Sequence, residues 1–350
     1  MPTAAGGRRA GSRRPFARRA GPPAAVSEAA AARPEAAGGP GAALGGLRED
    51  EVRACVVAAL AEDTGALGDV TALATVGPEV EATAEFLAKA DGVLAGTRVV
   101  ERVCASVDGA VACSWRKADG DAVRRGETLG SLRGPARSAL LAERTALNFL
   151  QRMSGIATAT ARMVAAAEGT GARILETRKT APGLRAVDKW AVRIGGGTNH
   201  RLGLYDMLLI KDNHVAAAGG VTAALDAALA YLAAQGLELE IEVETRTLDE
   251  VDEVVAFLAA RPAAAGRLTR IMLDNMVAPA EGGGGYDVGA LEAALARLQG
   301  SGLKTEASGN VNLESVGLIA RTGVDFISAG ALTHSVEALD ISLNIVVDAA

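Results

Sequence analysis

Charged side chains follow several short apolar runs in the second half of this 350-residue chain. Arg178 and Lys179 come shortly after one such run, Ile174-Leu175, and Lys211 comes directly after another, Met207 to Ile210. Two further runs end on single carboxylates, Glu244 and Asp274. Arginine and lysine bind carboxylates and phosphates through charge-assisted hydrogen bonds, and separated carboxylates suit a hydrated Mg²⁺ or sugar hydroxyls. The set therefore indicates a small polyanionic substrate.

Further candidates occupy similar places. His200 and Arg201 are adjacent, and two turns of small residues offer backbone N–H groups at the starts of helices, where anions bind. These turns are Ser308-Gly309-Asn310 and Ala329-Gly330-Ala331. Each feature also has an ordinary interpretation, because a charged pair after a strand can face solvent and a lone histidine is often structural. The repeated placement at strand ends favours the functional interpretation.

The apolar runs alternate with helical stretches, which predicts a parallel sheet. The predicted helices are 221–235, 248–260, 288–299 and 313–322. Six or seven such units with polar residues at the strand ends indicate a closed α/β barrel, whose active site lies on the carboxyl face. A doubly wound open sheet is the alternative. That fold usually carries a GxGxxG turn after its first strand, whereas residues 195–197 form only a run of glycines.

The first half has a different pattern. Helical spacing covers residues 47–61 and 138–152, and residues 81–96 alternate loosely before the turn Asp91-Gly92, which suggests a hairpin. We therefore expect a disordered segment at 1–46, a small α/β domain at 47–154 and an α/β barrel at 155–346.

Composition excludes several classes of protein. Residues 1–46 hold seven arginines and two glutamates, so with a net charge of −6 for the whole chain the remaining residues sum to −11. An acidic body with 3% aromatic residues is a poor nucleic-acid binder. No apolar run is long enough to span a membrane. Cys55, Cys104 and Cys113 have no metal-type spacing and read as free thiols.

The arginine-rich segment 1–46 has six arginines before its first acidic residue, Glu28. This pattern fits an organelle transit peptide, and it lacks the apolar centre of a secretory signal. A low-complexity tail without a targeting role is the other interpretation.

Several blocks together form a specific signature. They are Thr177 to Arg185, Lys189 through Asn199-His200-Arg201, Ile210 to His214, Glu242 to Glu244, Ile271 to Asn275, Glu306 to Val311, Gly330 to Ser335, Glu143 to Asn148 and Arg152 to Thr158. On these blocks the chain, over about residues 47–346, closely resembles the quinolinate phosphoribosyltransferases. The amino-acid sequences of several blocks are most similar to those of the plant and algal branch.

The resemblance implies an N-terminal α/β domain on an incomplete, seven-stranded α/β barrel. It also implies a reaction in de novo NAD biosynthesis. Quinolinate and phosphoribosyl pyrophosphate would give nicotinate mononucleotide, pyrophosphate and CO₂, with Mg²⁺, in a homodimer with shared active sites. Residues 1–46 and the loop extension Gly282 to Gly285 depart from the compact bacterial members.

The family's functional residues fall on matching positions. Quinolinate contacts are implied for Arg178, His200, Arg201 and Lys211, and for Arg144 across the dimer interface. Thr177 belongs to the same substrate-binding set. Lys179, Glu244 and Asp274 are implied as catalytic, with Lys179 near the phosphates and the two carboxylates near the ribose and the metal, directly or through water. Ser308, Gly309, Asn310, Ala329, Gly330 and Ala331 are implied to hold the 5′-phosphate.

Other functions remain open at this stage. A Schiff-base aldolase would use Lys211 or Lys179 as a nucleophile, and a barrel that only binds a metabolite would release no pyrophosphate. A nicotinate phosphoribosyltransferase would need fewer cations, since its substrate has one carboxylate fewer. For location, the plant-like body and the arginine-rich start favour the plastid, with mitochondrion and cytoplasm as alternatives.

Overall fold

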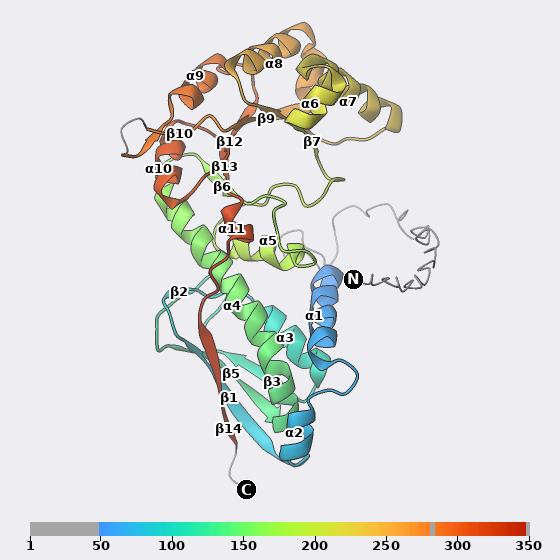
Figure 1. Cartoon of the computed structure of the whole chain (residues 1–350), viewed down its shortest axis with the longest axis vertical. Coiled ribbons are helices and arrows are strands. Elements are labelled where there is room, and N and C mark those ends of the chain that lie inside the picture. The colour runs from blue at the N-terminus through green and yellow to red at the C-terminus, as the bar shows by residue number, and fades with distance from the viewer. Residues whose placement is uncertain (1–48, 281–283, 348–350) are drawn as a thin grey trace, which may run out of the picture.

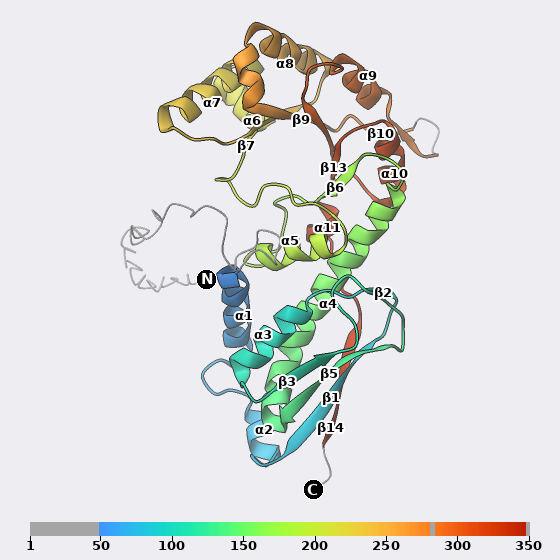
Figure 2. The same cartoon turned by 180° about the vertical axis from the view of Figure 1, so that it is seen from behind.

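The computed structural model describes residues 49–280 and 284–347 (Figure 1). One sheet lies at each end of the molecule, and the long helix α4 (Ala136–Ala166) runs from the first sheet toward the second. The same arrangement is seen from behind in Figure 2. The expected segment 1–46 and part of the expected Gly282–Gly285 extension lie outside the described residues.

The first sheet is antiparallel, with the strand order β14-β1-β5-β3. Its strands are β1 (Glu81–Ala88), β3 (Ala112–Trp115), β5 (Thr128–Pro135) and β14 (Ile341–Val347). Alternate residues of β1 are buried, Phe86 among them, because one face of the sheet packs against α3 (Thr97–Val107) and α4. Helices α1 (Glu49–Thr64) and α2 (Val70–Thr75) complete this region.

The expected hairpin at 81–96 is wrong. Strand β1 pairs with β5 and β14, while β2 (Gly92–Val93), which follows the turn, pairs with β4 (Ala122–Val123). A turn signal fixes where the chain reverses, but the partner of a strand depends on which sheet edge is free. The last strand also crosses the expected boundaries: β14 lies within 155–346 along the chain and adds a strand to the first sheet.

Helix α4 is twice as long as the segment 138–152 predicted from the sequence, and it passes through the expected boundary at residue 154. Its middle, residues 153–158, is buried all round, with Ile156 and Ala157 at 0% exposure. A Cβ atom on Gly155 would lie 2.2 Å from the carbonyl oxygen of Glu337. Glycine at this position therefore permits the close crossing of α4 and the segment that leads to β14.

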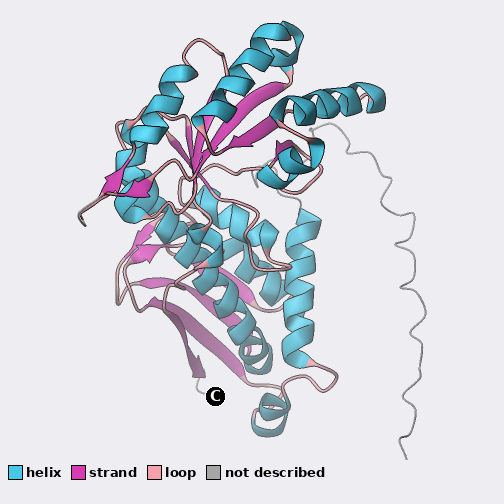
Figure 3. Cartoon of the chain, turned by 45° about the horizontal axis from the view of Figure 1, so that its top comes forward, coloured by secondary structure: helices cyan, strands magenta, loops and turns pink. Residues whose placement is uncertain are grey.

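The second sheet is parallel, with the strand order β6-β13-β12-β9-β8-β7. Figure 3 shows its strands in magenta, with helices packed around them. Its strands are β6 (Arg173–Leu175), β7 (Leu208–Ile210), β8 (Ile241–Thr245), β9 (Leu268–Asp274), β12 (Lys304–Ser308) and β13 (Phe326–Ser328). Every strand predicted from an apolar run is present. Six strands are described instead of seven, and a single parallel bridge from Leu175 to Thr198 extends the sheet beside β6. The predicted α/β class with a parallel sheet is confirmed.

Helices connect these strands. They are α5 (Arg185–Ile194), α6 (Asp212–Ala218), α7 (Val221–Gln235), α8 (Leu248–Ala260), α9 (Gly289–Arg297), α10 (Leu313–Arg321) and α11 (Ala331–His334), with a 3₁₀ turn at Pro262–Gly266. A short ribbon, β10 (Ala278–Pro279) with β11 (Tyr286–Asp287), follows β9 and flanks the Gly282–Gly285 extension. In the described part of the chain, no single helix has the length and hydropathy of a membrane span; α6 and α7 reach them only as a pair bent by 90°.

Candidate active site

A polar cavity of about 860 Å³ opens at the carboxyl ends of the parallel strands. Thirteen of the fifteen residues that the sequence singled out line it: Thr177, Arg178, Lys179, His200, Arg201, Lys211, Glu244, Asp274, Ser308, Gly309, Asn310, Gly330 and Ala331. Parallel strands bring their carboxyl ends to one edge, which is why residues distant in sequence meet here.

Two predicted residues lie elsewhere. Ala329 is 1% exposed, and its backbone N–H donates to the carbonyl of Leu175 at 2.9 Å, within the sheet. That N–H is therefore already used and does not face the cavity. Arg144 lies on the exposed side of α4, in the first region, and does not line the cavity of its own chain.

The loop that carries Thr177 to Lys179 is held in place by a buried carboxylate. Asp188 on α5 accepts two hydrogen bonds from Arg152 of α4, both at 2.8 Å, and one from the backbone N–H of Ala181 at 3.2 Å. On the other side, the hydroxyl of Thr333 donates to the carbonyl of Lys179 at 2.9 Å. Helices of both regions thus fix the loop before any ligand arrives.

The floor of the cavity is a set of buried charges that we call the floor cluster: Glu176, Lys189, His200, Glu242, Arg270 and Glu306. Lys189 and Glu176 are both fully buried and pair with each other. Lys189 Nζ also donates to the carbonyl of His200 at 3.1 Å, and Glu176 accepts from the His200 backbone N–H at 3.1 Å. Burial raises the pKa of Glu176 and lowers the pKa of Lys189. The attraction between the two opposite charges opposes both shifts. The pair therefore fixes the backbone of His200.

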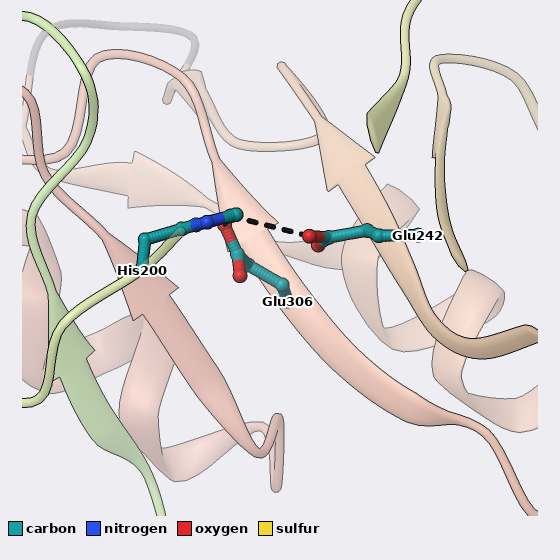
Figure 4. A group of neighbouring side chains, drawn as sticks. All are labelled: His200, Glu242 and Glu306. Atoms are coloured by element: carbon teal, nitrogen blue, oxygen red, sulfur yellow. Dashed lines mark ion pairs between the residues drawn. The ribbon is translucent and has the colours of Figure 1, made fainter. Parts of the chain in front are cut away.

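The imidazole of His200 faces two carboxylates, as Figure 4 shows. Its Nε2 atom lies 3.2 Å from Glu242 and 3.4 Å from Glu306. Arg270 pairs with the far side of Glu306 at 3.1 Å. Burial alone would lower the pKa of His200, but the charges of Glu306 and Glu242 outweigh it and raise the pKa to about 9. Burial and the charge of Glu306 raise the pKa of Glu242 to about 7, so the three groups share protons near neutral pH.

The donor atoms of His200, Glu242 and Glu306 lie within 4.8 Å of one another, a spacing at which a metal could bind. The charges around it favour a different use. Glu306 and Glu242 raise the pKa of His200 to about 9, so the ring is protonated at neutral pH. A protonated imidazole cannot bind a metal. The group is therefore an ion-pair cluster.

Two arginines share one side of the cavity. Arg201 donates to the carbonyl of Met207 at 3.2 Å, while Nε of Arg178 is buried and has no hydrogen-bond partner among the described residues. Burial and the nearby charge of Arg178 lower the pKa of Arg201. Neighbouring cations with unused donors are favourable only when an anion joins them, so this side of the cavity is an anion site.

The cavity carries a second set of charges, the rim cluster: Lys211, Asp212, Glu244, Arg246 and Asp274. Lys211 Nζ lies 3.0 Å from one oxygen of Glu244, and Arg246 lies 3.3 Å from the other. Arg246 also pairs with Asp212 at 2.7 Å and Asp274 at 3.4 Å. The side chains of Lys211 and Arg246 are 44% and 47% exposed, so water reaches these pairs.

The backbone of the turn 308–310 has a conformation that lets a neighbouring group approach it closely. Gly309 has φ +99°, and a Cβ on it would lie 2.3 Å from the side chain of Asn275. Asn310 and Asn275 also have positive φ, 52° and 58°. Asn312, which lines the cavity, caps α10 and donates to the hydroxyl of Tyr286 at 2.6 Å, which links this wall to the ribbon that flanks the loop extension.

Several cavity residues were missed from the sequence. Arg246, Asn275, Asn312 and His334 line the cavity, and Glu242 and Glu306 lie beneath it. A usable signal existed for Glu242, because it lies two residues before Glu244 and so on the same face of the strand. Arg246 follows the strand end directly and could have been included by the same reasoning as Arg178.

Comparison with known proteins covers nearly all of the described chain. Family models for the quinolinate phosphoribosyl transferase N-terminal and C-terminal domains match residues 69–154 and 156–344. The chain is 53% identical over 295 residues to the chloroplastic nicotinate-nucleotide pyrophosphorylase [carboxylating] of Arabidopsis thaliana, covering 84% of this chain and 83% of that protein.

Two further relatives support the same grouping. A mitochondrial quinolinate phosphoribosyltransferase [decarboxylating] 2b of Nicotiana tabacum is 54% identical over 287 residues, covering 82% of this chain and 80% of that one. Among solved structures, the nicotinate-nucleotide pyrophosphorylase of Francisella tularensis matches with a TM-score of 0.75 and 34% identity, over 87% of this chain and 99% of that chain.

Proposed function

The chain belongs to the quinolinate phosphoribosyltransferase family, and from that premise we propose that the polar cavity is where it carries out the family's reaction. The protein is a decarboxylating quinolinate phosphoribosyltransferase of NAD biosynthesis. The observation that carries the assignment of the site is the convergence of Arg178, Arg201 and Lys211 with two carboxylates in one cavity.

Quinolinate occupies the side lined by Arg178, His200, Arg201 and Lys211. It is a dicarboxylate, and the unused donor of Arg178 beside Arg201 is suited to one carboxylate while Lys211 reaches another part of the ring. The floor cluster fixes His200 below, so the ring orientation is set before binding. Thr177 closes the same wall.

Phosphoribosyl pyrophosphate occupies the remaining space. Ser308, Gly309, Asn310, Gly330 and Ala331 form the wall for the 5′-phosphate, and the exposed Lys179 faces the pyrophosphate. The N–H of Ala329, included in the sequence prediction, is used in the sheet, so Ala329 acts by shaping the turn.

Glu244 and Asp274 fit a divalent cation. Both carboxylates lie within 3.4 Å of the same guanidinium, that of Arg246, so they already converge on one positive charge. Carboxylate oxygens are the donors that Mg²⁺ prefers. Bound there directly or through water, Mg²⁺ would neutralise charge on the pyrophosphate as it leaves.

The reaction needs positioning more than covalent chemistry. The pyridine nitrogen is a modest nucleophile, and the ribose carbon becomes positively charged as pyrophosphate leaves. Glu244 and Asp274 stabilise that charge, Lys179 stabilises the leaving group, and the arginines hold the ring in line. The alkylated pyridinium then stabilises the carbanion left by loss of CO₂, so Lys179 and Lys211 orient and neutralise without forming a Schiff base.

Arg144 completes the site of a neighbouring copy. Its exposure on α4 and its absence from the cavity of its own chain support this role. Mixing inactive Arg144→Ala with inactive Lys211→Ala subunits should restore part of the activity, because one site of each mixed dimer is intact. Failure to restore activity despite verified subunit exchange would refute the shared site.

The plastid is the proposed location. Segment 1–46 is rich in arginine and poor in acidic residues, and the relatives include chloroplastic and mitochondrial plant proteins. A fluorescent fusion of residues 1–46 should enter plastids of a green-lineage cell. Mitochondrial or diffuse cytosolic fluorescence would contradict this.

A pyrophosphate-release assay with quinolinate, nicotinate and nicotinamide tests the proposed function. Quinolinate should be strongly preferred, since a site built for two carboxylates leaves cations unpaired when one is missing. Equal turnover of nicotinate would favour a nicotinate phosphoribosyltransferase. Binding of quinolinate without pyrophosphate release would favour a barrel that only binds, and borohydride trapping of a lysine would favour an aldolase.

A further inference from the structure

Arg246 holds the position at which both catalytic carboxylates converge. Its guanidinium lies 3.3 Å from Glu244, 3.4 Å from Asp274 and 2.7 Å from Asp212. All three partners line the cavity, so Arg246 neutralises a group of three carboxylates on its own side of the site. No role for Arg246 was predicted from the sequence, and the proposed reaction does not use it.

The guanidinium is free to leave this position. The backbone of Arg246 is fixed, because its N–H donates to Glu250 at 2.6 Å at the start of α8. The side chain, in contrast, is 47% exposed and lies on the cavity side. A long side chain on a fixed backbone can exchange partners without disturbing the fold.

A divalent cation at Glu244 and Asp274 would compete with this guanidinium. Two cations on the same pair of carboxylates repel each other at such short distances, so each weakens the binding of the other. A phosphate group offers the displaced arginine a better partner, since guanidinium binds phosphate through two parallel hydrogen bonds.

From this geometry, and resting on the proposed function, we propose that Arg246 is an internal counter-cation. It occupies the metal position in the free site and moves to the pyrophosphate group when the substrate and metal enter together. Metal binding to the free protein is therefore weak, and the diphosphate-bearing substrate strengthens it by removing Arg246 from the two carboxylates.

A titration of the full-length protein with Mn²⁺ alone tests this inference without any turnover. The amount of bound Mn²⁺ is measured from the decrease of the EPR signal of the free ion. Arg246→Met keeps the length of the side chain and removes its charge. It should bind Mn²⁺ about fivefold to tenfold more tightly than the unchanged protein. Arg246→Lys keeps the charge and should bind Mn²⁺ as weakly as the unchanged protein does.

Three controls sharpen the result. Arg261→Met removes another exposed arginine, paired with Asp226 at 2.7 Å outside the cavity, and should leave Mn²⁺ affinity unchanged. Glu244→Gln in the Arg246→Met background should abolish the gain, which would locate the bound ion. Phosphoribosyl pyrophosphate should tighten Mn²⁺ binding more in the unchanged protein than in Arg246→Met.

Equal Mn²⁺ affinity of Arg246→Met and the unchanged protein would overturn the inference, as would an equal gain in Arg261→Met. A melting temperature of Arg246→Met close to that of the unchanged protein would show that the difference is not structural. Failure of the proposed function would instead appear as missing quinolinate-dependent pyrophosphate release, whatever the Mn²⁺ titration gives.

Discussion

The floor and the rim of the cavity are both built from ion pairs, but the cations of the rim are far more exposed to water. In the floor cluster, Glu176, Lys189, Glu242 and Glu306 are 0% exposed. In the rim cluster, the cationic side chains of Lys211 and Arg246 are 44% and 47% exposed. An ion pair without water is costly to break, because the remaining charge has no other partner, whereas an exposed pair contributes at most about 1 kcal/mol.

The difference separates two tasks within one cavity. The floor cluster fixes the backbone of His200 through partners that lie within the chain itself. The rim cluster can exchange its partners for substrate and metal at little cost, because solvent already screens its charges. Substitutions should therefore affect stability at the floor and activity at the rim.

The largest effect is expected from Lys189→Met. It leaves the carboxylate of Glu176 buried without its partner, which should lower the free energy of unfolding by about 3–5 kcal/mol. Urea denaturation of the two proteins measures this. The double variant Lys189→Met with Glu176→Gln removes both charges and should recover part of the loss. If Lys189→Met were as stable as the unchanged protein, the proposed difference in stability between the floor cluster and the rim cluster would be wrong.

A pH effect of intermediate size should come from His200. Its pKa is raised to about 9 from an ordinary 6.5, so its contribution to stability is complete below pH 6.5 and is lost as the pH rises through 9. The free energy of unfolding should therefore fall by about 2 kcal/mol between pH 7 and pH 9. His200→Gln should remove most of this decrease. An identical decrease in the variant would assign it to other groups.

The smallest change in stability is expected at the rim. Lys211→Met leaves Glu244 paired with Arg246, so the free energy of unfolding should change by less than about 1 kcal/mol. Activity should nevertheless fall by about 10²–10³-fold, because a cation that positions the substrate is lost. A calorimetric scan and a steady-state assay on the same preparation test both parts. A large loss of stability in Lys211→Met would show that Lys211 stabilises the fold in the way expected of the floor cluster.

The sequence predicts the second region better than the first. Most strands of the parallel sheet are short apolar runs that end on polar residues, with β12 (Lys304–Ser308) the exception. This fold brings the strand ends together, so Arg178, Lys211, Glu244 and Asp274 could be grouped without coordinates. The prediction of the hairpin after β1 failed because partner choice among antiparallel strands depends on edges far away in sequence. Strand β14 is a clear case, since nothing near it in the chain shows that β1 is its partner.

Within the site, the sequence identified residues at strand ends and missed charges inside strands. Glu242 and Glu306 occupy positions that would face solvent in an open sheet with one exposed face. In this sheet they point toward the interior, where His200 and Arg270 neutralise them. The identity of these partners depends on how the sheet curves, and that curvature cannot be derived from the order of residues along one strand.

The pairing of β14 with β1 also sets an order of events during synthesis. Ala82 to Ala88 leave the ribosome more than 250 residues before their partners, Ile341 to Val347. Until then, one edge of the first sheet is open and could pair with another chain. A ribosome that stalls or stops within the last helices would therefore release a protein with a nearly finished catalytic half and an unprotected first half. Quality control of this enzyme would then act on its N-terminal region, although the fault lies at the C-terminus.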